Sequence, residues 1–224
     1  MIRTENLSRQ FQSGREVIHA LRDINIQINP GTLTILRGRS GSGKTTLINL
    51  LGALDKPTEG KIFFMDQDIT KLSEVKKDLL RKNNMGFIFQ SIALMPLMTA
   101  YENVEFGLRV AGYDKEKRKK RAEACLTMVG LQNRMHHRPQ ELSGGEQQRV
   151  AIARAIAHKP KVVFADEPTA ELDTNMGLQV VKVLKDLVEE EGLTVVMSTH
   201  DPSMIDIADC VYTLEDGVIV DIAE

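Results

Sequence analysis

Short runs of apolar and β-branched residues alternate with helical patterns along most of the chain. Strands are predicted near Leu7 and at residues 24–28, 32–36, 61–65, 85–89, 161–165, 194–198, 211–214 and 218–220. Helices are predicted at residues 45–51 and 175–191. Because several strands are apolar throughout and alternate with helices, we expect an α/β fold with a mostly parallel sheet covered by helices.

The middle third of the chain has a different pattern. Residues 101–158 are mostly helical, with Gly112, Gly130 and Pro139 as interruptions. The last two strands flank Asp216-Gly217, which predicts a hairpin. We therefore expect one domain over residues 1–224, in which residues 1–89 and 160–224 form an α/β core and residues from about 90 to 159 form a helical subdomain.

The composition excludes several classes of protein. The 224 residues include 29 Lys and Arg and 31 Asp and Glu, a net charge of −2, which argues against nucleic acid as the main partner. Two distant cysteines suggest neither a metal cluster nor a disulfide framework. Residues 1–11 lack the apolar stretch of a signal peptide, and the longest uncharged window, residues 83–101, is too polar to span a bilayer. Composition alone thus favours a soluble cytoplasmic protein.

One segment, residues 114–121, is a run of charges with six cations and two acids. We expect it to be the solvated face of a helix. The alternative is contact with anionic lipid headgroups.

Residues 38–45 fit the phosphate-loop pattern GxxxxGK[ST], and they follow a predicted strand and open a predicted helix. Glycines let backbone N–H groups wrap phosphates, and the helix N-terminus adds positive charge. Lys44 would reach the β- and γ-phosphates, and the Thr45 hydroxyl would ligate Mg²⁺. The predicted nucleotide-binding residues here are Gly38, Ser40, Gly41, Ser42, Gly43, Lys44, Thr45 and Thr46.

Two carboxylates follow the buried strand at residues 161–165, at the edge where α/β sheets bind ligands. We expect Asp166 to hold the Mg²⁺ shell. Glu167 would polarise the attacking water as general base.

A second anion-binding pattern lies at residues 142–155. Ser143 and Glu146 form an S-x-x-E capping box, and Gly144 and Gly145 expose backbone N–H groups at the start of the helix. Two incomplete phosphate cradles on one chain suggest that one cradle closes on a nucleotide held by another subunit.

These motifs resemble, in order and over nearly the whole chain, those of ATP-binding cassette (ABC) transporter nucleotide-binding subunits. The resemblance implies a P-loop core with an N-terminal antiparallel β part and a helical signature subdomain, and two cassettes, identical or paralogous, that pack head to tail around ATP and Mg²⁺. It implies that Phe11 stacks on adenine, with Ile18 as a possible second wall. It also implies that Gln90 contacts Mg²⁺ and the attacking water, and that His200 contacts the γ-phosphate. All catalytic groups are present, so we expect hydrolysis.

Two residues depart from the usual family pattern. Arg39 replaces a common Pro in the phosphate loop, and Glu171 stands where Asn or Ala is more usual. The resemblance places residues 170–173 at the interface between cassettes, so the carboxylate of Glu171 could alter coupling between the two sites.

The segments at residues 49–60, 86–90 and 94–104 resemble the macrolide-exporter and lipoprotein-release branch. That resemblance implies an integral membrane permease as partner, with the chain held peripherally at the cytoplasmic face of the membrane. A regulatory ATPase of a cell-division or cell-wall complex, and an importer ATPase, remain as alternatives. Within residues 83–101, we expect the loop at 94–98 to receive a short helix of the permease.

Overall fold

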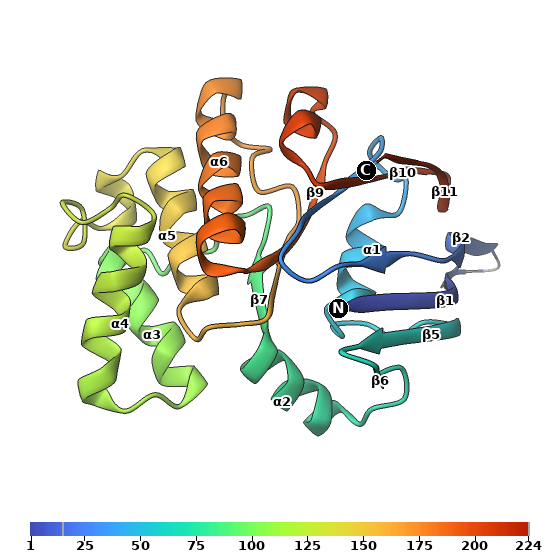
Figure 1. The fold of residues 1–224 in the computed structure, drawn as a ribbon, viewed down its shortest axis with the longest axis horizontal. Coiled ribbons are helices and arrows are strands. Elements are labelled where there is room, and N and C mark those ends of the chain that lie inside the picture. The colour runs from blue at the N-terminus through green and yellow to red at the C-terminus, as the bar shows by residue number, and fades with distance from the viewer. Residues whose placement is uncertain (15, 224) are drawn as a thin grey trace.

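The computed structural model describes residues 1–14 and 16–223, and a six-stranded sheet crosses its centre (Figure 1). The strand order is β11-β10-β4-β9-β8-β7. Strands β10 to β7 are parallel, and β11 pairs antiparallel with β10. The strands are β4 (Leu33–Arg37), β7 (Met85–Ile88), β8 (Val162–Ala165), β9 (Thr194–Thr199), β10 (Cys210–Glu215) and β11 (Val218–Ala223). The predicted parallel sheet and terminal hairpin are confirmed.

A second, antiparallel sheet has the order β2-β1-β5-β6, and β3 pairs with β1. Its strands are β1 (Ile2–Ser13), β2 (Glu16–Ile24), β3 (Gln27–Ile28), β5 (Glu59–Phe64) and β6 (Gln67–Asp68). The prediction of a single strand over residues 24–28 is wrong, because strand pairing is interrupted between the end of β2 at Ile24 and the start of β3 at Gln27. The Thr4 hydroxyl occupies this break, since it donates to Ile24 O and accepts from Ile26 N.

The helices are α1 (Lys44–Leu51), α2 (Glu74–Asn84), α3 (Ala100–Ala111), α4 (Lys115–Met128), α5 (Gly144–Ile156) and α6 (Thr174–Glu191), with short 3-10 helices η1 (Pro139–Glu141) and η2 (Pro202–Ile207). Helices α3, α4 and α5 pack side by side at the left of Figure 1. The sequence did not predict α2, because it is lysine-rich and carries few apolar residues: Leu79 and Val75 are both exposed.

The six-stranded sheet separates two hydrophobic cores. Val163 and Ala165 belong to the core shared with α3–α6, whereas Val162 and Phe164 belong to the core shared with α1 and the antiparallel sheet. Successive side chains of a strand point to opposite faces. A strand with a core on each side is therefore apolar at every position.

Four functional segments begin where parallel strands end. The phosphate loop follows β4, Gln90 follows β7, Asp166-Glu167 follows β8, and His200 follows β9. Because the carboxyl ends of parallel strands share one edge of the sheet, these segments gather there.

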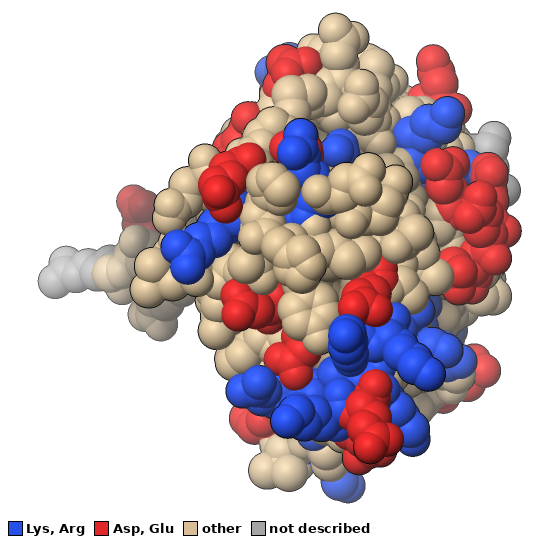
Figure 2. Space-filling model, turned by 90° about the vertical axis from the view of Figure 1, so that its left-hand side faces the viewer, with Lys and Arg blue, Asp and Glu red and all other residues tan. Residues whose placement is uncertain are grey.

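The charge run at residues 114–121 spans the N-cap and first half of α4, and most of its side chains are exposed. Figure 2 views the side of the molecule on which α4 lies. In the lower part of this view, Lys and Arg side chains gather, with Asp and Glu among them. The predicted solvated helix face is confirmed. In the part of the chain that the structure describes, no helix is both long and apolar enough to cross a membrane.

Candidate nucleotide site

The phosphate loop between β4 and α1 adopts a backbone conformation that glycine favours. Gly41 and Gly43 have φ angles of 82° and 103°, in the left-handed region that costs other residues energy. A Cβ on Gly43 would lie 2.6 Å from Ala20 O. Gly217 N donates to Ser42 O at 3.1 Å, so the β10–β11 turn also supports the loop.

Lys44 is folded back into this loop. Its side chain is only 4% exposed, and Nζ donates to Gly38 O at 2.9 Å and to Arg39 O at 3.1 Å. The same Nζ lies 3.3 Å from Oε1 of Glu167. A buried ammonium needs such partners, because an uncompensated charge is costly away from water. The cation is thus positioned where the loop would wrap a phosphate.

The Asp166 carboxylate is placed by two hydroxyl groups. The Oγ of Ser198 donates to Asp166 Oδ1 at 2.7 Å, and Oγ1 of Thr45 donates to the same oxygen at 3.1 Å. A hydroxyl and a carboxylate oxygen side by side suit Mg²⁺, which prefers hard oxygen ligands. These residues therefore fit the metal that the sequence implies.

Glu167 holds an unusual backbone conformation with φ 43°, which is sparsely populated by residues other than glycine. Its N–H donates to Ser198 Oγ at 2.8 Å, and its Oε2 lies 3.2 Å from Nδ1 of His200. Strained backbone of this kind persists where surrounding contacts impose it. The carboxylate consequently bridges Lys44 and His200.

One cavity of about 1030 Å³ unites most of the predicted site. Its lining includes the predicted residues Ser40, Gly41, Gly43, Lys44, Thr45, Thr46, Gln90, Glu167 and His200. Gly38 and Ser42 line an adjoining cavity of about 770 Å³, and Asp166 reaches the first cavity through Thr45. The hydroxyl of Ser42 is buried without a hydrogen-bond partner among the described residues, which leaves a donor available to a bound anion.

The predicted adenine wall lies on the hairpin of β1 and β2. Phe11 pairs across the strands with Ile18, so their side chains share one face of the sheet. Ile18 lines the 1030 Å³ cavity, whereas Phe11 lies outside its lining, 40% exposed and covered on one side by the Arg9 guanidinium at 4.4 Å. The structure therefore brings Ile18, rather than Phe11, directly to the cavity.

The signature segment starts α5 with the predicted capping box. Glu146 N donates to Ser143 Oγ at 3.3 Å, and Ser143 N donates to Glu146 Oε2 at 2.8 Å. The bond from the Ser143 backbone, with smaller contributions from the Ser143 hydroxyl and from Arg134, lowers the pKa of Glu146 below its usual value. The exposed Ser143 hydroxyl lies at the N-terminus of α5, directly before Gly144.

The signature and the phosphate loop do not meet within the chain. Among residues 1–14 and 16–223, the cavity lining includes none of residues 143–146. Helix α5 packs in the core on the α6 face of the six-stranded sheet, whereas α1 packs on the other face. The two anion cradles are therefore separate within the described part of the chain.

Sequence reasoning did not assign Ser198, although it touches both Asp166 and Glu167. Its signal was a polar residue near the carboxyl end of a buried strand. His19, Ala20 and Arg22 of β2 also line the cavity without having been predicted there.

Comparison with known proteins agrees with this arrangement. A family model described as ABC transporter matches residues 21–170. The macrolide export ATP-binding/permease protein MacB of Bartonella henselae is 44% identical over 216 residues, which cover 96% of this chain and 33% of MacB. The chain thus spans about a third of that relative. The lipoprotein-releasing system ATP-binding protein LolD 1 of Rhodospirillum rubrum is 41% identical over 219 residues, covering 98% and 97% of the two chains.

The fold also matches solved structures. The ATP-binding cassette MJ0796, solved as a dimer in a post-hydrolysis state with ADP and Pi, has a TM-score of 0.90 to this chain and 39% identity. The match covers 100% of this chain and 98% of that cassette. With a matching family model, relatives above 40% identity and a matching cassette fold, this chain belongs to the ABC transporter family, as an ATP-binding cassette that hydrolyses ATP.

Proposed function

We propose that this chain closes head to tail on a second cassette, with two ATP molecules between them, and drives a membrane permease of an export or lipoprotein-handling system. The observation that carries the proposal is the separation of the two anion cradles within one chain. A two-fold dimer satisfies both cradles at once, because each contact is repeated by symmetry. The second cassette is a copy of this chain or a paralogue.

In this dimer, the phosphate loop and Lys44 bind the β- and γ-phosphates. Thr45, Asp166 and Gln90 hold Mg²⁺, which neutralises charge on the phosphates when bound. Ser143, Gly144 and Gly145 of the second cassette donate to the γ-phosphate from the other side. The face of Phe11 and Ile18 supports adenine through apolar and stacking contact.

Glu167 is the proposed general base for the attacking water. Its contact with Lys44 gives that carboxylate a cationic neighbour in the free chain, and the phosphates of ATP compete for the same ammonium. When ATP engages Lys44, one Glu167 oxygen is released toward water. His200, 3.2 Å from the other oxygen, orients the carboxylate and contacts the γ-phosphate. Hydrolysis then removes the γ-phosphate contacts to Ser143 and His200, and the dimer opens.

The permease docks in an apolar groove between α2, β7 and α3. The groove has a volume of about 590 Å³ and an apolar floor formed by Phe87, Met95, Phe106 and Val110. It suits the apolar face of a short amphipathic helix. Of the predicted docking loop at residues 94–98, Met95 lines the groove, whereas Leu94 packs against the core.

Buried Asn103 holds this loop in shape. Its side chain accepts from Met95 N and donates to the carbonyls of Met95, Met98 and Thr99. Docking at such a groove places the chain peripherally at the cytoplasmic face of the membrane.

The test is the Glu167→Gln variant. We expect ATP hydrolysis to fall by ~100- to 10,000-fold, as loss of a general base does, and an ATP-bound dimer to accumulate in sedimentation velocity. Normal turnover would contradict the assignment of Glu167. A monomer at saturating ATP would contradict head-to-tail closure. Glu189→Gln, on the exposed side of α6, serves as the matched control, and we expect it to hydrolyse ATP normally and to remain free of trapped dimer.

A further inference from the structure

Two exposed, oppositely charged side chains lie on the two surfaces that closure would join. Arg39 is the second residue of the phosphate loop, and Glu171 lies between Glu167 and α6. Within residues 1–14 and 16–223, neither charge has an ion-pair partner within 4 Å. Each is thus available to a second molecule.

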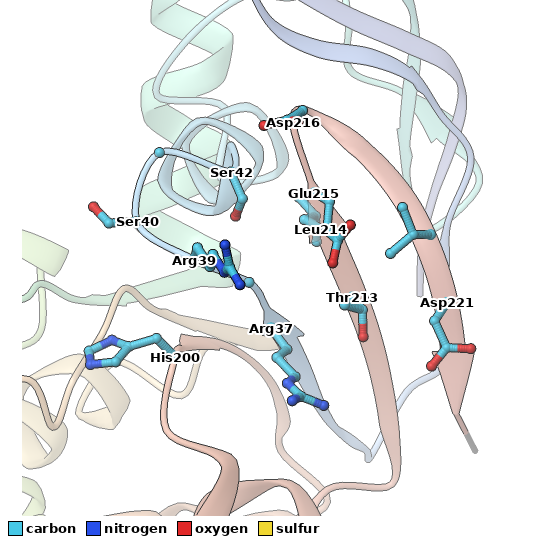
Figure 3. A pocket seen from close by; sticks show the side chains of 13 residues that line it. Arg37, Arg39, Ser40, Ser42, His200, Thr213, Leu214, Glu215, Asp216 and Asp221 are labelled. Carbon is cyan, nitrogen blue, oxygen red and sulfur yellow. The ribbon is translucent and has the colours of Figure 1, made fainter.

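Arg39 stands at the rim of the nucleotide cavity. It is among the residues that line both the 1030 Å³ cavity and the adjoining 770 Å³ cavity. In Figure 3, Arg39 projects from the loop in the middle of the view, while Arg37 lies on the strand below it. Arg37 lines the adjoining cavity alone, on the side of Glu215 and Asp221. Both arginines are exposed, and Arg39 is the one of the two that lines the nucleotide cavity.

Glu171 belongs to a segment that packs against the signature of its own chain. Leu172, the next residue, has its Cδ2 only 3.1 Å from where a Cβ on Gly144 would lie. Two turn hydrogen bonds fix the segment, from Ala170 N to Glu167 O and from Leu172 N to Thr169 O. Glu171 is therefore next in sequence to a residue that packs beside the Gly144 cradle, and it is itself exposed.

We propose that Arg39 of one cassette forms an ion pair with the partner's Glu171 when the ATP-bound dimer closes. The proposal rests on the head-to-tail closure proposed above. It adds a specific contact that helps to select the partner cassette. Two-fold symmetry repeats the contact, so each dimer contains two such pairs. Complementary charges at an interface select partners and fix register, and like charges opposite each other exclude wrong ones. A second copy of this chain would supply both residues of each pair.

The test is charge reversal in the Glu167→Gln background, with the dissociation constant of the ATP-bound dimer measured by sedimentation. Arg39→Glu or Glu171→Arg alone should raise that constant by about 10- to 100-fold, because each places two like-charge contacts in one interface. The double swap, Arg39→Glu with Glu171→Arg, should restore it to within about threefold. Arg37→Glu with Glu171→Arg is the matched control and should give no recovery.

Each outcome separates the two proposals. If the parent dimerises with ATP but the double swap does not recover, the ion pair is overturned and closure stands. If the parent stays monomeric at saturating ATP, closure and the ion pair both fail. A direct readout combines Arg39→Cys with Glu171→Cys and treats the variant with a short bismaleimide. We expect a covalent dimer with ATP and none without it. The parent, whose cysteines are Cys125 and Cys210 alone, is the blank. A covalent yield at the blank level with ATP also overturns the pair.

Discussion

The ammonium of Lys44 lies 3.3 Å from the carboxylate of Glu167, so the residue that would bind phosphate and the residue that would activate water neutralise each other in the free chain. Lys44 is nearly buried, and its remaining partners are the carbonyls of Gly38 and Arg39. The pair shares one cavity with Thr45, Gln90 and His200. Binding and chemistry are therefore coupled through a single contact.

Lys44→Ala should weaken binding of ATP by about 10- to 100-fold, because hydrogen bonds from a charged group contribute roughly 1.5–3 kcal/mol each. Fluorescence titration with a nucleotide analogue measures the effect. An ATP affinity equal to that of the unaltered chain would contradict the assignment of Lys44 as a phosphate-binding residue. Lys61→Ala, at an exposed position of strand β5, is the control, and we expect it to bind normally.

Ser198→Ala should lower kcat about tenfold and raise the Mg²⁺ concentration needed for half-maximal hydrolysis. Ser198 is fully buried, donates to Asp166 and accepts from Glu167 N, so its loss frees the carboxylate and leaves a backbone donor unpaired. Ser198 acts here as a positioning residue. The measurement is steady-state hydrolysis across a Mg²⁺ series, with Ser203→Ala on η2 as the control. An unchanged Mg²⁺ dependence would remove Ser198 from this role.

Val110→Asp should abolish co-purification with the permease while ATP binding by the isolated chain is unchanged. Val110 is 61% exposed in the apolar groove, so a carboxylate there disturbs docking without entering the core. Val75→Asp, 70% exposed on α2 but outside the groove lining, is the matched control. Full recovery of the permease with Val110→Asp would exclude this groove as the docking surface.

Glu146→Ala should destabilise the chain by about 1 kcal/mol at neutral pH, as loss of a helix cap does. The folded pKa of Glu146 lies below its ordinary value, so ionised Glu146 stabilises the fold above that ordinary value. This contribution is lost as the pH falls through the lowered pKa. Urea unfolding at neutral pH and below pH 4 measures it, and the difference from the unaltered chain should shrink in acid. Glu116→Ala on α4, which has no capping bond, is the control.

Much of the fold follows from local pattern. The apolar run at residues 162–165 favours a strand with a core on each face, and the glycine pattern of residues 38–45 favours a loop that wraps an anion beside a helix. The order of these segments then places Asp166, Glu167 and His200 at one sheet edge. These predictions needed no long-range information.

What could not be predicted depends on contacts between distant segments. Helix α2 carries few apolar residues, so its periodicity is weak. The break between β2 and β3 depends on the side chain of Thr4, more than 20 residues away. The bond from Ser198 to Asp166 spans 32 residues, and Phe11 lies outside the cavity lining although its cross-strand partner Ile18 belongs to it. Such relationships exist only once the two sheets are assembled.

The support that residues 20 and 217 give to the phosphate loop has a consequence for nucleotide affinity. Gly43 lies against Ala20 O, and Gly217 N holds Ser42 O. The loop is thus a preformed template, and binding does not have to order a flexible segment, which would otherwise weaken affinity. The template belongs to the tertiary fold, because segments near both ends of the chain shape it. A substitution at Ala20 or Gly217 should therefore change how tightly ATP is held by changing the shape of the phosphate loop.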